Sequence, residues 1–353
     1  MMQEKKLSVF CRYGEKGASS RVRFFRYRPF FESAGIKVDY HSFFDDAYLE
    51  RLYSGKGRDL SALVRGFYRQ LKAIRSTSPD TPLLIEYELF PFLWAQGELS
   101  FLKNRKFFLN FDDPVWEKYA NFPLLKNKYD TLVAHASGVI VANGLLAERF
   151  GKLNSRLIKI PTAIDLERYT AAGAEEKFPK FTVVWIGSPA TFHYLSAFQG
   201  TLKKLAELFD FELLVIGKKS LPPLPGVNMT AVEWSEESEA ALLSRAHTGI
   251  MPLPEESFAK GKSAYKLIQY GGAAIPALAS AVGENCNIVE HGVNGFLCRN
   301  EAEWIQNFSQ LYNDALLRER MGKAGFRKAR EWSLEVNAPR LIDFIFSSGE
   351  KKI

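Results

Sequence analysis

The feature that most constrains this sequence is a series of twelve short, β-branched or aromatic apolar runs, separated by stretches with helical periodicity. Runs of this kind are typical of strands in a parallel sheet that is buried on both faces. Six runs lie in each half of the chain, so the sequence predicts the same α/β architecture twice. The predicted strands are 6–13, 37–43, 82–87, 106–111, 138–142 and 157–160 in the first half, and 181–187, 211–217, 227–233, 248–253, 274–279 and 295–298 in the second.

The length of the chain and the polar stretch between the two series predict two domains. At 353 residues the chain is longer than a usual single domain of roughly 100–200 residues. The stretch after the sixth run contains AAGAEEKFPK, which is typical of a linker. We therefore expect domains at 1–165 and 181–330, a linker at 166–180, and a C-terminal helix within 331–353 that packs back on the N-terminal domain.

Composition limits the partners and the compartment. The net charge of +7 and the pI near 9.1 predict attraction to an anionic partner, such as nucleotide phosphates or lipid headgroups. Nucleic acid is not expected, because recognition motifs are absent and the arginines are not gathered on one basic element. No run of about 18 apolar residues is present, so we expect no membrane span. Three widely spaced cysteines and the absence of a signal segment predict a cytoplasmic protein, either free or peripheral at the cytoplasmic membrane face.

Residues that follow the predicted strands are the candidate site residues, because open parallel sheets bind ligands beyond the carboxyl ends of their strands. The first such segment is GEKGASSRVR, after strand 6–13. Gly17 permits a close turn, Ser19 suits a helix cap, and Arg21 is the arginine nearest the loop. We predict that these three residues lie on the acceptor side of the site, although a capped glycine turn alone has the same sequence.

The helix predicted after this loop, RVRFFRYRPF, alternates arginines with aromatic residues. One interpretation is that it binds a membrane surface or an anionic, lipid-linked acceptor. The other is that its aromatic rings enter the core while its arginines are solvated. The sequence leaves both open.

The strand 106–111 ends in two aspartates. Asp113 precedes Pro114 and is predicted to cap the next helix, because Asp at the cap followed by Pro is a common helix start. Asp112 has no such explanation, so it is predicted to face a sugar or acceptor hydroxyl and to assist as a base. Too few further ligands lie nearby for a metal site.

The strand 181–187 leads into WIGSPAT. Gly187 permits close approach, Ser188 suits a cap, and Thr191 adds a hydroxyl donor. A helix start at the carboxyl end of a strand attracts anions, so we predict that these residues contact the donor phosphates. Glu233, at the end of strand 227–233, is a further predicted donor-binding residue.

The segment after strand 248–253 is rich in lysine. A helix is predicted from Ser263 to Tyr270, with Lys262 and Lys266 on one face of it and Lys260 just before it. Solvated lysines are common, yet their place after a strand predicts contact with the donor, with Lys262 and Lys266 stabilising the leaving diphosphate. Ser263 is included among the donor-binding residues.

Several blocks together resemble glycosyltransferase family four and its broader group 1, over nearly the whole chain. The blocks are GASSRVR, VIVAN, WIGSPAT, EWSEESEAALLSRAHTGIMPLP, GKSAYKLIQYGGAAIP and IVEHGVNGFL, in this order. The resemblance implies a GT-B fold, with two Rossmann-like doubly wound parallel-sheet domains facing a central cleft. It also implies transfer, with retention and without a metal cofactor, of a sugar from a UDP-, GDP- or ADP-sugar to a glycan or lipid-linked acceptor, as in cell-envelope polysaccharide biosynthesis.

The chain departs from the family at two positions. The family pattern carries two glutamates with seven residues between them, where this chain has Gly261 and Gln269 in a GKxxxKLxQY variant. The resemblance gives the second position a ribose contact, which the amide oxygen of Gln269 can still accept. Lys262 and Lys266 are predicted to compensate for the glutamate missing at Gly261.

Two other functions remain open at this stage. One is a nucleotide-sugar epimerase of the same fold, for which we find no cluster of carboxylates and histidines. The other is a non-catalytic protein that binds a sugar nucleotide, which the two missing glutamates leave possible.

Overall fold

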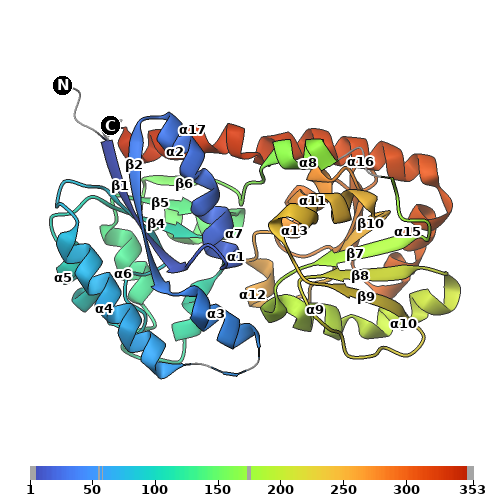
Figure 1. The fold of residues 1–353 in the computed structure, drawn as a ribbon, viewed down its shortest axis with the longest axis horizontal. Coiled ribbons are helices and arrows are strands. Elements are labelled where there is room, and N and C mark those ends of the chain that lie inside the picture. Colours follow the sequence, from blue (N-terminus) through green and yellow to red (C-terminus); the bar gives the residue numbers. More distant parts are fainter. Residues whose placement is uncertain (1–4, 55, 58, 173–175, 348–353) are drawn as a thin grey trace. The chain divides into compact units, whose positions relative to one another are not determined.

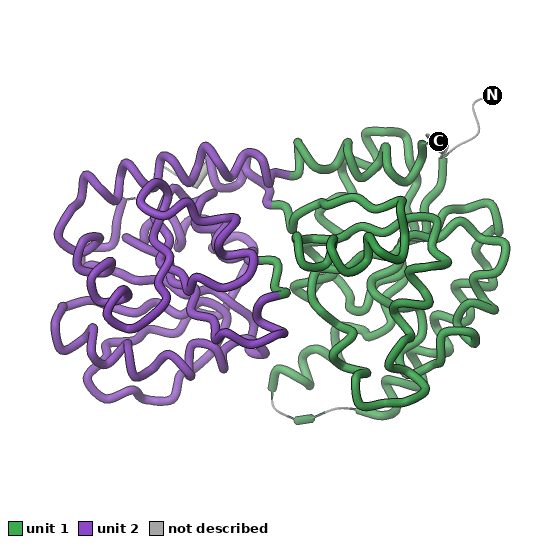
Figure 2. Tube along the Cα trace, turned by 180° about the vertical axis from the view of Figure 1, so that it is seen from behind, with its two compact units in different colours: residues 1–163, 261–263, 334–353 green, residues 164–260, 264–333 purple. Residues whose placement is uncertain are grey.

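The computed structural model describes residues 5–54, 56–57, 59–172 and 176–347. The chain forms two compact units, coloured green and purple in Figure 2. The first consists of residues 1–163, 261–263 and 334–353, and the second of residues 164–260 and 264–333. Each unit is built on its own parallel sheet (Figure 1).

The sheet of the first unit has six strands among the described residues, in the order β2-β1-β3-β4-β5-β6. All neighbouring pairs are parallel, so all carboxyl ends lie at one edge. The order changes direction at β1, which makes the sheet doubly wound. Its strands are β1 (Lys5–Tyr13), β2 (Ile36–Phe44), β3 (Leu83–Glu86), β4 (Phe107–Phe111), β5 (Gly138–Val141) and β6 (Leu157–Lys159).

Helices cover both faces of this sheet, because β3, β4 and β5 are apolar on both sides and every residue in them is buried. One face packs against α4, α5, α6 and α7, and the other against η1, α2 and α17. The bounds are α1 (Ala18–Arg23), η1 (Phe25–Tyr27), α2 (Arg28–Ser33), α3 (Asp46–Tyr53), α4 (Leu60–Ser76), α5 (Ala95–Leu102), η2 (Val115–Tyr119), α6 (Lys128–His135), α7 (Gly144–Gly151) and α17 (Leu334–Phe346).

The arginine-rich segment after β1 does not form one exposed helix. It breaks at Phe24, where α1 ends and the short η1 begins. Phe24 and Tyr27 are each 1% exposed, and Arg23 is buried too, donating to Asn110 Oδ1 and to the carbonyl of Ile160. The aromatic rings therefore enter the core as the second interpretation expected, but Arg21 and Arg23 follow them instead of remaining in solvent.

The sheet of the second unit also has six parallel strands among the described residues, in the order β12-β11-β10-β7-β8-β9. The order changes direction at β7. The predicted pair of doubly wound sheets is therefore confirmed, with every predicted strand present. The strands are β7 (Thr182–Ile186), β8 (Glu212–Ile216), β9 (Asn228–Val232), β10 (Thr248–Met251), β11 (Ala277–Ser280) and β12 (Gly295–Cys298).

Two layers of helices cover this second sheet. One hydrophobic cluster contains residues of α8, α11, α13 and α14, and the other contains residues of α9, α10, α15 and α16. The bounds are α8 (Leu166–Ala172), η3 (Pro189–Thr191), α9 (Phe192–Ala197), α10 (Gln199–Leu208), α11 (Glu236–Arg245), α12 (Ser257–Lys260), α13 (Tyr265–Gly272), α14 (Asn285–Ile288), α15 (Glu301–Asn313), α16 (Ala315–Ala329) and η4 (Arg330–Trp332).

The stretch expected to be a linker, 166–180, includes a helix of the second unit. Tyr169 of α8 is 3% exposed and donates its hydroxyl to Glu239 of α11, at 2.6 Å. Residues 173–175 lie outside the described residues. In the last helix, α17, Leu334, Ala338 and Leu341 are buried in the same core as β1 and β4.

Candidate functional site

The carboxyl edge of the first sheet is built around a buried carboxylate, Glu86, at the end of β3. Its side chain is 2% exposed and accepts hydrogen bonds from the hydroxyls of Ser19 and Ser20 and from the backbone amide of Arg12. Burial raises the pKa of Glu86, and the two hydroxyls and the amide lower it in part. These bonds fix the loop between β1 and α1 to the next strand of the sheet.

The predicted roles of this loop change accordingly. The N-cap of α1 is Gly17, which has no side chain to cap with, and the predicted cap Ser19 lies inside the helix and donates its hydroxyl to Glu86. A Cβ on Gly17 would lie 2.3 Å from the Tyr13 side chain, so glycine is required by close packing. Arg21 is 7% exposed and donates to the carbonyls of Glu15 and Lys16, which holds the loop closed.

Asp112 follows β4 and accepts a hydrogen bond from the hydroxyl of Tyr87, which follows β3. Asp112 is 6% exposed, and burial together with the neighbouring Asp113 raises its pKa to about 7. The backbone of Tyr87 is left-handed, with φ of 63°, which is unusual for a bulky residue. Asp112 therefore titrates near neutral pH. Tyr87 was not predicted as a site residue, because the sequence showed only the end of a strand there.

Asp113 does not cap a helix, contrary to the prediction. The short η2 begins at Val115 with Pro114 at its N-cap position. The carboxylate of Asp113 instead lies 3.3 Å from the ammonium group of Lys262, which belongs to the same unit. A residue 149 positions away supplies this partner, which no local signal could predict.

Gly261, at the first position where the family carries glutamate, packs against Pro114. A Cβ there would lie 2.7 Å from the proline ring, and the carbonyl of Gly261 accepts a hydrogen bond from Asn143 at 2.7 Å. The surroundings therefore leave no room for a glutamate side chain. Ser263 belongs to the same short segment of the first unit.

A second buried charge cluster lies beneath this edge. Lys128 is 1% exposed and donates to Glu88 at 2.7 Å, and lies 2.9 Å from Glu98. Lys118 also donates to Glu88, at 3.0 Å, and burial lowers the pKa of Lys118 to about 8. Burial alone would raise the pKa of Glu88, but Lys128 and Lys118 outweigh it and leave that pKa below its ordinary value. A cavity of about 10 Å³ adjoins the cluster, with room for one water-sized group, and is lined by Arg12, Phe43, Glu86, Tyr87, Glu88 and Pro91.

The carboxyl edge of the second sheet is built around two glycines. Gly217, after β8, has φ of +112°, and a Cβ on it would lie 1.9 Å from the carbonyl oxygen of Gly187, after β7. A Cβ on Gly187 would itself meet the Trp185 ring at 2.5 Å and the Thr191 hydroxyl at 2.7 Å. The two loops therefore approach each other at backbone distance, which requires glycine at both positions.

Lysines surround these glycines. The ammonium group of Lys266, on α13, lies 5.2 Å from the centre of the buried Trp185 ring. Lys218, directly after Gly217, lies 4.3 Å from the centre of the Phe192 ring. The exposed Lys219 pairs with Glu233 at 3.2 Å. Lys218 and Lys219 were missed by sequence reasoning, although their position after a strand-ending glycine was a usable signal.

Ser188 and Thr191 bracket η3, a single short turn. Ser188 makes no side-chain cap, and the Thr191 hydroxyl donates to the carbonyl of Ser188 at 3.0 Å. The turn therefore starts with Ser188 as predicted, but the Ser188 side chain does not cap it, because the acceptor is the backbone carbonyl of Ser188.

Helix α13 begins two residues later than predicted, at Tyr265. Ala264 precedes it in a left-handed conformation, with φ of 53°, so Lys262 lies outside the helix and does not share a face with Lys266. Gln269 lies within α13 and is 4% exposed. Lys260 ends α12 and pairs with Glu255 at 3.2 Å.

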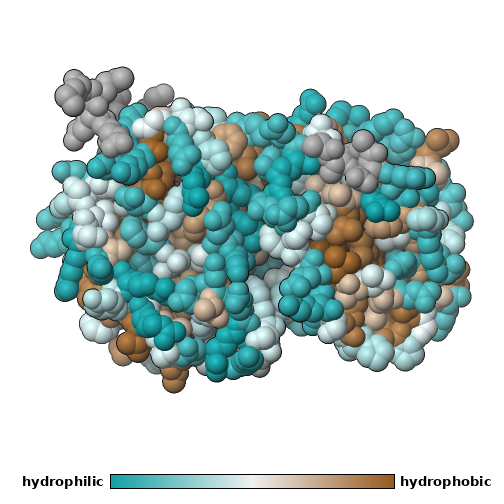
Figure 3. Space-filling view, in the orientation of Figure 1, coloured by the Kyte–Doolittle hydropathy of each residue, from teal (hydrophilic) through white to brown (hydrophobic). Residues whose placement is uncertain are grey.

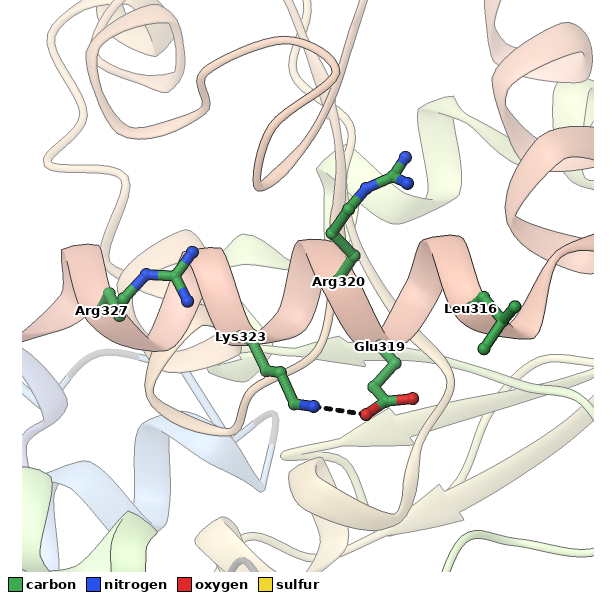
Figure 4. A pocket seen from close by; sticks show the side chains of 5 residues that line it. All are labelled: Leu316, Glu319, Arg320, Lys323 and Arg327. Carbon is green, nitrogen blue, oxygen red and sulfur yellow. Dashed lines mark hydrogen bonds and ion pairs between the residues drawn. The ribbon is translucent and has the colours of Figure 1, made fainter.

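Two other features of the described residues do not contribute to these edges. No group of three or more His, Cys, Asp or Glu side chains among them is arranged to hold a metal ion. A pocket of about 310 Å³ lies along α16, and its lining residues all come from that one helix (Figure 4), namely Leu316, Glu319, Arg320, Lys323 and Arg327.

Comparison with solved structures shows the fold. The chain is similar to sucrose-phosphate synthase from Thermosynechococcus elongatus, with a TM-score of 0.69 and 14% identity, covering 96% of this chain and 98% of that one. It is similar to a glycosyltransferase from Rickettsia africae, with a TM-score of 0.68 and 12% identity over 98% and 100% of the two chains. Anabaena HepE, solved with UDP-glucose, gives a TM-score of 0.66 and 14% identity over 96% and 98%.

Comparison with family models identifies the second unit. Residues 180–314 match the model of glycosyl transferases group 1. No curated protein sequence matches the chain. The matched residues contain both glycine loops, Lys218 and Lys266. The chain is therefore a glycosyltransferase of the GT-B fold, with a group 1 domain in its second unit.

Proposed function

We propose that this glycosyltransferase moves a sugar from a nucleoside diphosphate sugar to a hydroxyl group of a glycan or lipid-linked acceptor, with retention of the anomeric configuration and without a metal. The observation that carries the proposal is the coincidence of the group 1 match with a strand edge where Gly187 and Gly217 meet and Lys218 and Lys266 gather. Such an edge suits a diphosphate, because ammonium groups favour negative charge and the glycines place no side chain between a ligand and the loops.

The second unit holds the donor in this proposal. As the bond between the anomeric carbon and the diphosphate oxygen breaks, negative charge grows on the departing phosphate. Lys266 and Lys218 stabilise that charge. Ser188, Thr191 and Lys260 belong to the same unit and are further proposed donor contacts. Gln269 remains a proposed ribose contact, and Glu233 remains a proposed donor-binding residue. Each hydrogen bond to a charged group contributes about 1.5–3 kcal/mol.

The first unit holds the acceptor. The acceptor oxygen bonds to the anomeric carbon on the face that the diphosphate leaves, and its proton passes to a departing phosphate oxygen. Asp112, held by Tyr87, orients the acceptor hydroxyl by accepting a hydrogen bond from it, while the proton itself passes to the phosphate oxygen. Lys262, which pairs with Asp113 on this unit, remains a proposed contact of the leaving diphosphate.

Product analysis tests the proposal. The purified chain is incubated with UDP-, GDP- and ADP-sugars and with simple glycosides and polyprenyl-phosphate sugars as acceptors. We expect nucleoside diphosphate release with one donor and a product of unchanged anomeric configuration by NMR. Nucleotide binding without any release would contradict the transfer, rearrangement of the donor without an acceptor would indicate an epimerase, and an inverted product would contradict retention.

A further inference from the structure

Helix α4 carries a stripe of exposed apolar side chains. Leu60, Val64 and Tyr68 are 78%, 69% and 68% exposed, and their spacing of four residues places them on one face. The opposite face is already packed: a Cβ on Gly66 would lie 2.5 Å from the ring of Phe43, at the end of β2. The exposed stripe therefore is not needed for the core of the unit.

All charged side chains of the same helix are basic. It contains Arg65, Arg69, Lys72 and Arg75 and no acidic residue. Arg65 pairs with Asp59, the N-cap of α4 itself, and Arg69 pairs with Asp45, the N-cap of α3. Lys72 and Arg75 are exposed and form no ion pair within the described part of the chain.

The stripe lies at the ligand-binding edge of the first unit. Arg69 donates to the carbonyl of Phe43 and the Phe67 ring contacts the Phe43 ring, so the middle of α4 is level with the carboxyl end of β2. Leu60 and Val64 lie in earlier turns, towards and beyond that end. In Figure 3, hydrophobic side chains are visible at the lower tip of this unit, where the first turns of α4 lie in Figure 1.

We propose that α4 docks the first unit on an anionic lipid bilayer. Leu60, Val64 and Tyr68 enter the boundary between headgroups and acyl chains, while Lys72 and Arg75 contact lipid phosphates. An apolar stripe flanked by basic side chains that form no ion pair fits an anionic bilayer better than a protein partner. Protein interfaces bury about 800 Å² per partner and are depleted in lysine. No described helix has the length and apolar character needed to cross a bilayer, so this contact lies at the surface.

The inference does not depend on donor or acceptor identity, because binding is measured without turnover. The full chain is sedimented with vesicles of phosphatidylcholine alone or of equal parts phosphatidylcholine and phosphatidylglycerol. We expect binding to the anionic vesicles that weakens with added salt. The triple variant Leu60→Ser, Val64→Ser, Tyr68→Ser and the double variant Lys72→Glu, Arg75→Glu should each lose about tenfold in vesicle affinity.

A matched control distinguishes a specific contact of α4 from an effect of the overall net charge on vesicle binding. Arg320→Glu with Arg327→Glu removes the same charge from the exposed face of α16 in the second unit. This control should retain vesicle binding, and thermal melts should show all variants folded, because every changed residue is exposed. The proposal is overturned if wild type does not bind anionic vesicles, if the α16 control loses as much affinity as the α4 variants, or if the α4 triple variant abolishes self-association in sedimentation velocity while vesicle binding persists.

Discussion

The two sheets share one architecture, yet the side chains at their carboxyl edges are opposite in charge and in burial. The first edge presents Glu86 and Asp112, both nearly inaccessible to solvent and held by hydroxyl groups. The second presents Gly187 and Gly217 at backbone contact, with lysines around them. A parallel sheet fixes only where its strands end, so the chemistry of each edge depends on the few residues that follow the strands.

The largest expected effect concerns the buried charges of the first edge. Lys128→Met removes a cation that touches both Glu88 and Glu98 and leaves two carboxylates without it in the core. We expect unfolding free energy to fall by about 3–5 kcal/mol, as for other broken buried pairs, measured by urea denaturation. Lys152→Met, which breaks an exposed pair with Glu148, should cost less than about 0.5 kcal/mol. Similar losses of unfolding free energy in both variants would show that the buried ion pairs of the first edge stabilise the fold no more than an exposed pair does.

The second edge depends on backbone approach instead of charge balance. Gly217→Ala places a methyl group 1.9 Å from the Gly187 carbonyl at φ of +112°. We expect a loss of about 3 kcal/mol or more and a lower nucleotide affinity, because the two loops must separate. Gly226→Ala is the control, since Gly226 also has positive φ but no atom within 4 Å of the added methyl. If Gly226→Ala lowers the unfolding free energy as much, the positive φ alone, and not the close approach of the two loops, explains the requirement for glycine at position 217.

A pH titration examines the carboxyl group of the first edge. The folded-state pKa of Asp112 is raised to about 7, above its usual value of 3.8, so the folded protein holds this proton more tightly than the unfolded chain does. Its stabilising contribution is therefore complete below about pH 4 and is lost as pH rises to about 7. Relative to wild type, Asp112→Asn should gain about 4 kcal/mol across this interval in urea titrations, and a constant difference would rule out the raised pKa.

The smallest expected effect concerns one lysine of the second edge. Lys266→Met keeps the methylene stem over Trp185 but removes the charge. Nucleoside diphosphate affinity should fall about tenfold by calorimetry, equal to about 1.4 kcal/mol, with little change in melting temperature. Lys203→Met on α10, which is exposed, is the matched control. Equal affinities for wild type and Lys266→Met would remove this lysine from the donor site.

The sequence predicted the sheets well because buried parallel strands leave continuous apolar runs such as FFLNF and TVVWI. It predicted helix starts less well. Ser19 and Asp113 each have the right type for a cap, but each is engaged by a distant partner, Glu86 and Lys262 respectively. Local propensity cannot anticipate such contacts, since the partner comes from another strand or loop.

Burial also changed the interpretation of charged segments. The alternating arginines and aromatics near residue 24 left open both a membrane-binding helix and aromatic rings packed in the core with solvated arginines, and tertiary packing places Phe24 and also Arg23 in the core. The left-handed Ala264 likewise moved the start of α13 and separated Lys262 from Lys266, because a single residue of that conformation interrupts the helix. The exposed stripe of α4 became visible only once the opposite face was seen to be packed.

The most direct test of the division between the two edges measures nucleotide binding and sugar transfer in the same two variants. Calorimetry with UDP, GDP and ADP is followed by turnover with the best donor, for Asp112→Asn and for the double variant Lys218→Ala, Lys266→Met. The account predicts that Asp112→Asn binds nucleotide as wild type does but transfers sugar at least tenfold more slowly, while the double variant loses nucleotide affinity. Loss of nucleotide binding in Asp112→Asn, with unchanged binding in the double variant, would contradict it.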